Sequence, residues 1–348
     1  MKLFSTTVVS RLLLFVTVCA VWATPVARSL AESPSSPDQN VDNEEATKTF
    51  GRPVRVVTLS FLNKPVDEVL QSVDEEGAQG ADIIALPETW TGKEVMTLDG
   101  PIMQRLCELA KKHRTYIVNS VYRQAEGERF NSAILIDREG RVAGIYDKVY
   151  PHSAEFDAVT QLAAGKQVPI FETDFGKLGL AICFDANFPE LWSSLADQGA
   201  ELVIWPSAYW AGRALQAHAI NHHYYIVTST WRGHCLVYDI TGDLLLESSK
   251  EDFLVTRITL DLDRRVYHGD FNWEKAQRLI NDHPDEVELD KFLHQEHWFI
   301  LKAKRGGVNV LSLAKQYGLE EHRDYVKRSR TELNRRRGDV AKVDAGGK

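Results

Sequence analysis

The segments QGADIIALPE (79–88) and QGAELVIWPS (198–207) decide the fold, because they are two copies of one pattern and align without a gap. Three further pairs of segments occur in the same order: LSF (59–61) with ICF (182–184), YIVNSVYR (116–123) with YIVTSTWR (225–232), and ILIDREG (134–140) with LVYDITG (236–242). Four matched blocks in one order are hard to obtain by chance, so the sequence contains an internal repeat.

Each copy of the repeat has the pattern strand, helix, strand, helix, strand and then a hairpin through Asp-x-x-Gly. Helices are expected over 66–77 and 189–199, where periodic segments carry proline near the first turn and glycine near the end. The strands are short, apolar and β-branched. Such alternation predicts a mixed sheet with helices on one face. Two halves of this kind can bury their bare faces against each other, which predicts an α/β fold, a four-layer α-β-β-α sandwich of two pseudo-symmetric halves.

The N-terminal segment differs from the rest of this 348-residue chain, whose 44% hydrophobic and 26% charged residues are typical of a globular protein with a sizeable core. Lys2 and Arg11 flank the start of the apolar run 12–23, which ends in Val21-Trp22-Ala23. This pattern predicts a signal peptide (1–23) cleaved near Ala23 and a secreted or periplasmic protein. The run is shorter than the roughly 20 residues of a membrane span, so no stable span is expected. Residues 24–51 are polar and rich in Pro and Ser, which predicts a disordered linker.

Charge and cysteine content restrict the partners and the use of thiols. Removal of residues 1–23 takes away Lys2 and Arg11, so the formal net charge of −8 becomes −10, which argues against a nucleic-acid partner. Loss of Cys19 leaves Cys107, Cys183 and Cys235, an odd number, so at least one thiol stays unpaired in a monomer. Cys107 and Cys235 either form a disulfide bond or are two buried, small side chains with free thiols.

Three separated residues carry the chemistry: Glu88 in LPETW, Lys148 in YDKVYP and Cys183 in AICFDANFPE. Each follows an apolar run that is typical of a strand. A thiol nucleophile needs a base, and the carbonyl that it attacks needs a positive charge or N–H donors where the oxygen becomes anionic. Glu88 and Lys148 belong to the first half and Cys183 begins the second, so we expect the active site at the junction of the halves.

These motifs, in this order, resemble the nitrilase superfamily of carbon–nitrogen hydrolases over about residues 53–263. The resemblance implies that Cys183 is the nucleophile, Glu88 the general base and Lys148 the oxyanion stabiliser. It also implies a second glutamate, Glu155, because the chain has the K-x-x-P-x-x-x-E pattern of the nitrilase and aliphatic-amidase branches. The sandwich fold agrees with this family, and the chemistry needs no cofactor.

The surroundings of these residues suggest a substrate-binding set. The turn after Cys183 leaves the backbone N–H of Phe184 available to a developing oxyanion, and Asp185 is expected to bond N–H groups within the turn. The substrate-binding candidates are Phe184, Trp90, Asn187, Ser207 and Tyr209. A solvated loop serine is the alternative for Ser207.

No metal site is predicted. His218 and His222 are spaced i, i+4 on a helix expected over 213–223, but the H-E-x-x-H pattern fails because position 219 is Ala. A helix face toward solvent or a neighbouring subunit is the expected role of these histidines.

The domain prediction is a hydrolase domain over 52–265 and a C-terminal extension over 266–348. The extension, with a charged helix over 320–337, is expected to be helical and to contact another subunit in a homodimer or larger homo-oligomer through Trp298, Phe299 and Ile300.

The predicted function is hydrolysis of a small amide or N-carbamoyl compound through a cysteine thioester. The alternatives are a nitrilase acting on a small nitrile, which usually has Trp-Glu rather than Phe184-Asp185 after the nucleophile, and a catalytically silent secreted binding protein on the same fold. Carbamoyl-amino-acid hydrolases typically place arginine where this chain has Ala186 and Asn187, so a preference for neutral amides is expected.

Overall fold

The computed structural model describes residues 50–156, 161–249 and 253–338. The predicted signal peptide and all but the last two residues of the predicted linker lie outside these described residues. No described helix combines the length and apolar character needed to cross a membrane.

The first sheet contains mainly strands of the first half. Its strands, in spatial order, are β13 (Phe253–Asp261), β1 (Pro53–Phe61), β2 (Ile83–Ala85), β4 (Tyr116–Ala125), β5 (Glu128–Ile136) and β6 (Val142–Asp147), with β3 (Val95–Met96) also paired to β4. The β1–β2 and β2–β4 pairs are parallel, and the β4–β5 and β5–β6 pairs are antiparallel hairpins. The sheet is therefore mixed, as predicted.

The second sheet repeats this arrangement. Its strands, in spatial order, are β7 (Ile170–Thr173), β8 (Gly176–Leu180), β9 (Leu202–Ser207), β10 (Tyr225–Thr230), β11 (Leu236–Tyr238) and β12 (Leu244–Glu247). The β8–β9 and β9–β10 pairs are parallel, and the β10–β11 and β11–β12 pairs are antiparallel. The repeated pattern in the sequence corresponds to a repeated strand order.

Each half gives its last strand to the sheet of the other half. Strand β7 ends the first half and pairs antiparallel with β8, whereas β13 ends the second half and pairs antiparallel with β1 over nine positions, Pro53↔Asp261 to Phe61↔Phe253. Side chains also cross between the sheets, because the Ser229 hydroxyl on β10 donates to the carbonyl of Leu59 on β1 at 2.7 Å. The two halves are thus joined by backbone pairing as well as by apolar packing.

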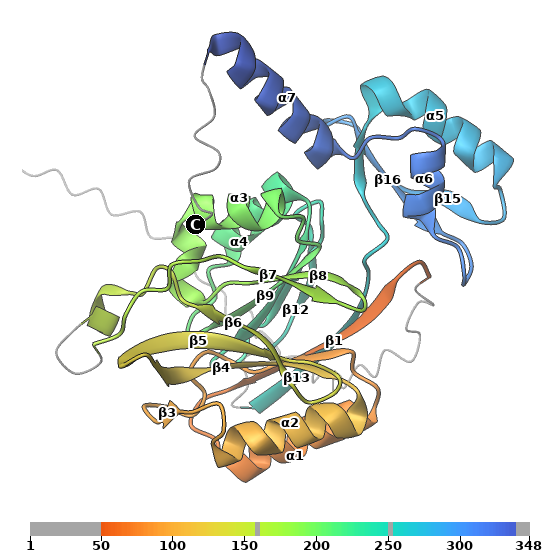
Figure 1. Cartoon of the computed structure of the whole chain (residues 1–348). Helices are drawn as coiled ribbons and strands as arrows, with labels where there is room; N and C mark the ends of the chain where they lie inside the picture. Colours follow the sequence, from red (N-terminus) through yellow and green to blue (C-terminus); the bar gives the residue numbers. More distant parts are fainter. Residues whose placement is uncertain (1–49, 157–160, 250–252, 339–348) are drawn as a thin grey trace, which may run out of the picture. The chain divides into compact units, whose positions relative to one another are not determined.

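Four layers result from this pairing (Figure 1). Helices α1 (Val66–Ala78) and α2 (Pro101–His113) cover the outer face of the first sheet, and α3 (Pro189–Asp197) and α4 (Gly212–His222) cover the outer face of the second. Alternate strand residues point to different layers: Val56 packs between the sheets, whereas its neighbour Val57 packs with α1 and α2. The predicted α-β-β-α sandwich is confirmed.

The C-terminal extension is not simply helical, which corrects the prediction. It contains a three-stranded antiparallel sheet of β14 (Val266–His268), β16 (Trp298–Ala303) and β15 (Val287–Leu293), together with helices α5 (Gly269–Asp282), α6 (Val310–Gln316) and α7 (His322–Arg337). The segment proposed to contact another subunit is strand β16, and its Phe299 and Ile300 are fully buried within the chain's own packing. Those two side chains are therefore not available to a partner.

His218 on α4 also differs from expectation. His218 is buried, its ring stacks on Trp192 at 4.5 Å between centroids, and its Nε2 lies 2.9 Å from the carbonyl of Ala186. This ring packs inside the domain, where it joins α4 to α3 and to the turn that follows Cys183. Neither solvent nor another subunit is the neighbour of His218.

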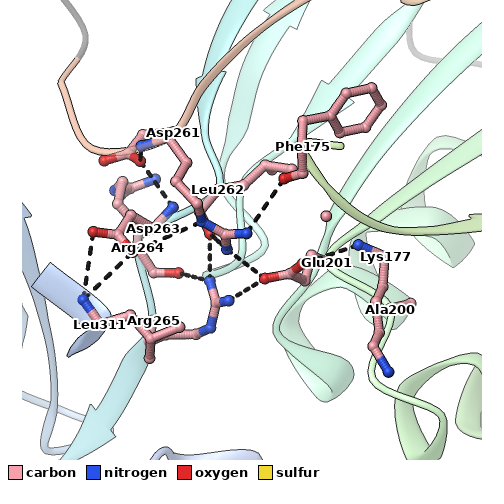
Figure 2. A network of polar contacts seen from close by, with 12 residues as sticks. Phe175, Lys177, Ala200, Glu201, Asp261, Leu262, Asp263, Arg264, Arg265 and Leu311 are labelled. Carbon is pink, nitrogen blue, oxygen red and sulfur yellow. Dashed lines mark hydrogen bonds and ion pairs between the residues drawn. The ribbon is translucent and has the colours of Figure 1, made fainter. Parts of the chain in front are cut away.

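A buried ionic network connects the two sheets to the extension (Figure 2). Glu201, which precedes β9, forms ion pairs with Arg52 and Arg265, and Arg265 also pairs with Glu321 at 3.2 Å. Asp263 accepts hydrogen bonds from the N–H groups of Val310 and Leu311 at the start of α6. The extension is thus tied by charge to the end of the hydrolase domain.

Candidate active site

The turn that holds Cys183 is strained and tightly fixed. Cys183 begins a short 3₁₀ helix (Cys183–Asn187) after β8, and its φ of +46° is unusual for a residue with a side chain. The buried Asp185 carboxylate accepts hydrogen bonds from the N–H of Ile182 and the hydroxyl of Tyr146, both at 2.7 Å, and from the N–H of Tyr150 at 3.1 Å. The expected structural role of Asp185 is confirmed, and its contacts fix the conformation in which Cys183 is held.

Glu88 lies at the junction of the halves, directly after the strand β2 and its extension through Leu86. The residue is 5% exposed, and its Oε2 accepts a hydrogen bond from the N–H of Ala208 in the second half at 2.9 Å. Its carbonyl accepts from the indole N–H of Trp231 at 2.7 Å. Groups from the second half therefore position a carboxylate from the first half.

Lys148 follows β6 and is 1% exposed. Its Nζ lies 2.9 Å from Glu88 Oε1 and 2.7 Å from Glu155 Oε2. Its backbone is held on both sides, because its N–H donates to the carbonyl of Asn131 and its carbonyl accepts from Gly165, each at 2.8 Å. Burial alone would lower the pKa of Lys148, but the negative charges of Glu88 and Glu155 outweigh burial and raise that pKa well above its ordinary value, so Lys148 stays charged.

The Cys183 thiol lies beside these charges. Burial raises the pKa of Cys183 well above its ordinary value, and the charge of Glu88 raises it further, against the opposing effects of Lys148 and of hydrogen bonds from the Ala208 N–H and the Ser207 hydroxyl. The Ala208 N–H thus faces both the sulfur and the Glu88 carboxylate, which places the thiol next to a base. A thiol in this environment is neutral at rest and must lose its proton as it attacks.

The structure therefore brings together the four residues predicted to carry the chemistry, Glu88, Lys148, Cys183 and Glu155. The first two and the last come from the first half, and Cys183 comes from the second. An acceptor for a proton, a fixed positive charge and a nucleophile meet at one point, which is the arrangement required for acyl transfer to sulfur.

The predicted substrate-binding residues are divided between the site and the core. Phe184 is half-buried and packs edge-on against His152 and Phe188, and exposed Asn187 donates to the Phe184 carbonyl at 3.0 Å. The Tyr209 ring packs edge-on against Trp205. Burial raises the pKa of the Tyr209 hydroxyl most, and its interaction with Cys183 raises that pKa further, so Tyr209 lies at the site.

Ser207 and Trp90 differ from expectation in opposite directions. Ser207 is fully buried beside the Cys183 thiol, so it is not a solvated loop serine. Trp90 does not join the cluster: its ring packs edge-on against Phe61 in the core beneath α1 and α2, and its indole donates to Asn119 at 2.7 Å. The intervening Thr89 has a φ of +44°, which turns the chain after Glu88 and directs Trp90 back into the core.

Two residues of the site were missed by the sequence reasoning. Asn131 on β5 donates to Glu88 Oε1 at 2.8 Å and to Glu155 Oε1 at 2.9 Å. Tyr122 on β4 pairs with Asn131 in the sheet, and the charges of Glu155 and Glu88 raise the pKa of its hydroxyl after the larger effect of burial. The available signal was a buried amide in the apolar strand FNSAILI (130–136), since a polar side chain inside a core strand requires partners.

One group of side chains in the described residues has the composition of a metal site. The ligand atoms of His268, Asp270 and His297 lie within 4.8 Å of one another, and His297 Nδ1 lies 3.0 Å from Asp270 Oδ1. That distance is an ordinary Asp–His hydrogen bond, and the group lies in the extension. The chemistry at Cys183 draws on none of these residues.

Comparison with known proteins identifies the family. The family model named Carbon-nitrogen hydrolase matches residues 60–266. The chain is 28% identical over 152 residues to a hydrolase of Schizosaccharomyces pombe, a match that covers 39% of this chain and 47% of that protein, which is less than half of its length. It is 26% identical over 216 residues to the omega-amidase NIT2 of Mus musculus, covering 53% of this chain and 78% of that protein.

A solved structure agrees with the observed fold. An amidase from Nesterenkonia sp. AN1, determined with acrylamide added at its active-site cysteine, superposes with a TM-score of 0.53 at 21% identity and covers 65% of this chain and 99% of that chain. That amidase is described as belonging to the nitrilase superfamily. The family match spans more than half of the sequence, and the chain therefore belongs to the carbon-nitrogen hydrolases of the nitrilase superfamily, which are enzymes.

Proposed function

We propose that this enzyme hydrolyses the carbon–nitrogen bond of a small amide through a thioester on Cys183. Membership of the carbon-nitrogen hydrolase family and similarity to an omega-amidase support amide hydrolysis. The observation that carries the finer proposal is the meeting of Glu88, Lys148 and Cys183 at the junction of the two halves.

In the first half-reaction, Cys183 Sγ attacks the amide carbon while its proton passes to Glu88. The oxygen of the tetrahedral intermediate is stabilised by the Lys148 ammonium and by the N–H of Phe184, which stands in the first turn of the 3₁₀ helix where N–H groups lack an intrahelical partner. Collapse breaks the carbon–nitrogen bond, and the proton on Glu88 moves to the departing nitrogen, which leaves as ammonia or an amine.

In the second half-reaction, Glu88 takes a proton from water, and the resulting hydroxide attacks the thioester carbon. The same donors stabilise the second oxyanion. The carbon–sulfur bond then breaks, the proton returns to sulfur, and the carboxylic acid leaves. Each step uses the same base and the same oxyanion site, which agrees with a buried cluster built around a single thiol.

The charges near the thiol support a neutral substrate. Lys148, the cation beside Cys183, is already shared by Glu88 and Glu155. Arg232, which follows β10, lines a surface depression with Lys64 and Glu68. Neutral amides are therefore expected to be better substrates than matched compounds with a free carboxylate, because Ala186 and Asn187 in the turn after the thiol cannot make the bidentate contact of an arginine.

The test is ammonia release from a panel of small amides, N-carbamoyl compounds and nitriles, with and without a carboxylate. Cys183→Ala should abolish release while circular dichroism shows an unchanged fold. Cys107→Ala removes a half-buried thiol on α2, away from the site, and is the matched control that should retain activity. Preference for a nitrile over its amide would favour the nitrilase alternative. No turnover on any compound would favour the silent binding protein.

Export is proposed from the N-terminal pattern alone. The mature chain should begin near Thr24 and be recovered outside the cytoplasm, and N-terminal sequencing of native protein tests this. Assembly into a homodimer or larger homo-oligomer is likewise a proposal, for which sedimentation of the full chain is the measurement.

A further inference from the structure

The side-chain amide of Asn131 bridges the two glutamates of the site. Both of its N–H groups are used: Nδ2 lies 2.8 Å from Glu88 Oε1 and 2.9 Å from Glu155 Oε1. The residue is 1% exposed, and its backbone carbonyl also accepts the N–H of Lys148 at 2.8 Å. One strand residue therefore contacts every charged member of the cluster.

The orientation of this amide is determined by its surroundings. If the oxygen and nitrogen were exchanged, Oδ1 would face two carboxylate oxygens and no donor, so the NH₂ group must point toward the glutamates. Oδ1 is buried and has no hydrogen-bond partner among the described residues. A buried carbonyl without a partner is costly, and the two charge-assisted bonds of Nδ2 offset that cost.

The cluster holds two carboxylates and one ammonium, of which Lys148 and Glu88 are almost fully buried and Glu155 is partly buried. Two carboxylates that share a site repel each other and favour uptake of a proton, whereas hydrogen bonds donated to the ionised form favour that form. A protonated Glu88 could not accept the proton of Cys183. The two N–H groups of Asn131 act in the direction that keeps both glutamates ionised with Lys148 between them.

We infer that Asn131 is the positioning residue that keeps Glu88 available as a base while Glu155 remains ionised beside Lys148. This inference rests on the proposed function, because it assigns the base that the mechanism uses. The other titratable side chains that face the cluster in the described residues are Tyr122 on β4, Asp185 and Cys183 in the 3₁₀ helix, and Tyr209 after β9. The N–H groups of Ala208 and His152 each donate to one glutamate, at 2.9 Å and 2.6 Å, whereas the neutral side chain of Asn131 donates to both.

The experiment is the pH profile of kcat/KM for the wild-type chain and for Asn131→Asp. The new carboxylate would lie within hydrogen-bonding distance of both glutamates, so the cluster should hold a proton to higher pH. The acidic limb of the profile should move up by about one pH unit or more. Activity should accordingly fall about tenfold or more at pH 6 and less at pH 8. An acidic limb that stays at the wild-type position would overturn the inference.

Asn119→Ala is the matched control. Asn119 is also a fully buried asparagine, on the adjacent strand β4, but it bonds Trp90 and Met103 rather than the glutamates. The Asn119→Ala substitution should lower stability and leave the acidic limb of the pH profile in place. Asn131→Ala removes both donors and should lower kcat more than it changes KM. If Asn119→Ala moves the limb equally, loss of packing is the cause and the inference fails.

A second measurement covers the case in which Asn131→Asp turns over too slowly to assay. The thermal stability deficit of Asn131→Asp relative to wild type should grow from pH 5 to pH 8, because the added carboxylate must ionise beside two others. A deficit independent of pH would contradict the inference. Failure of the proposed function is distinguishable, because wild type would then release no ammonia and Cys183→Ala would change nothing.

Discussion

At Lys148, one buried ammonium contacts two carboxylates and, in the proposed mechanism, also stabilises the oxygen of the substrate. The charged form of Lys148 is stabilised by neighbouring side chains rather than by water, since only 1% of the residue is exposed. A lysine in this position can stabilise an oxyanion without reorganisation, which makes a fixed positive charge effective in catalysis.

Lys148→Met should therefore lower kcat/KM by about 10²–10³-fold, the usual effect of removing one oxyanion donor. The loss should appear mainly in kcat, because the contact strengthens as negative charge develops on the oxygen. Steady-state kinetics on an amide substrate, with circular dichroism to confirm folding, measure this. Wild-type turnover in the variant would mean that Lys148 does not hold the oxyanion.

The charge on Glu88 has opposite effects on turnover and on thiol reactivity. Burial is the largest cause of the raised pKa of Cys183, and the charge of Glu88 is the second largest. Glu88→Gln removes it, so the thiolate fraction at pH 8 should rise and alkylation of Cys183 by iodoacetamide should become faster, although amide turnover is lost. Mass spectrometry of the labelled chain over time gives the rate.

Ser207→Ala is the control of opposite sign for this measurement. Its hydroxyl lowers the pKa of Cys183 by hydrogen bonding to the sulfur, so its removal should slow alkylation. If both variants change the rate in the same direction, the two groups do not act on the thiol in the way that their positions indicate.

At the scale of single elements, the turn after β8 places the Cys183 thiol by backbone geometry. Cys183 has a φ of +46°, a region in which glycine is unstrained and other residues are not. Cys183→Gly should therefore be about 1 kcal/mol more stable than Cys183→Ala, although glycine in place of alanine normally destabilises the folded chain. Urea unfolding of the two inactive variants measures the difference.

Ala181→Gly, two residues earlier, provides the comparison. Ala181 is fully buried and is absent from the residues with positive φ, so glycine should cost about 1 kcal/mol there. A Cys183→Gly variant that is less stable than Cys183→Ala would show that the turn relaxes when the thiol is removed.

The same elements show what the sequence could and could not predict. Helices expected over 66–77 and 189–199 are observed at Val66–Ala78 and Pro189–Asp197, because local periodicity and proline position define them. Strand β16 (Trp298–Ala303) was not recognised, because a short apolar run fits a strand and an interface equally well. Its pairing with β14 and β15 depends on tertiary contacts that the local sequence does not show. The inward direction of Trp90 depends on the positive φ of Thr89, which no local rule for threonine predicts.

Residues of the candidate site that stand in a sequence motif could be predicted. Residues that reach the site only through three-dimensional contacts could not. Glu88, Lys148, Glu155 and Cys183 each stand in a recognisable motif after an apolar run, and the structure brings them together. Asn131 lies 43 residues from Glu88 and 24 from Glu155, and only the pairing of β5 with its neighbours places its amide between them. Spacing along the chain cannot show such a bridge.

At the scale of the whole described chain, Glu201 belongs to the ionic network that connects the hydrolase domain to the extension through Arg265 and Glu321. Burial alone would raise its pKa, but Arg265 and Arg52 outweigh burial and lower that pKa below its ordinary value of 4.5. The ion pairs therefore stabilise the folded state fully above pH 4.5, and this contribution is lost as the pH falls through the lowered value.

Glu201→Gln should lower the free energy of unfolding by about 3 kcal/mol at pH 7, because the buried Arg265 and the half-buried Arg52 each lose one of their anionic partners. The difference from wild type should shrink below pH 4.5, where wild-type Glu201 takes up a proton. Denaturant unfolding at several pH values measures this. Glu172→Gln, which removes an exposed pair with Lys177, is the control and should change stability by less than about 1 kcal/mol. A Glu201→Gln deficit that persists unchanged at pH 3.5 would contradict the argument.

The exchange of last strands between the halves also has a consequence for biosynthesis. Strand β1 needs β13, and their paired residues Val57 and Arg257 are 200 positions apart in the sequence. While the ribosome is still making the second half, β1 has an uncovered edge of backbone N–H and carbonyl groups, which is the kind of surface that recruits other strands. Closure over so long a loop is slow. The nascent chain should therefore depend on chaperones until about residue 261 has emerged, and interruption of synthesis between the halves should yield aggregates rather than a folded first half.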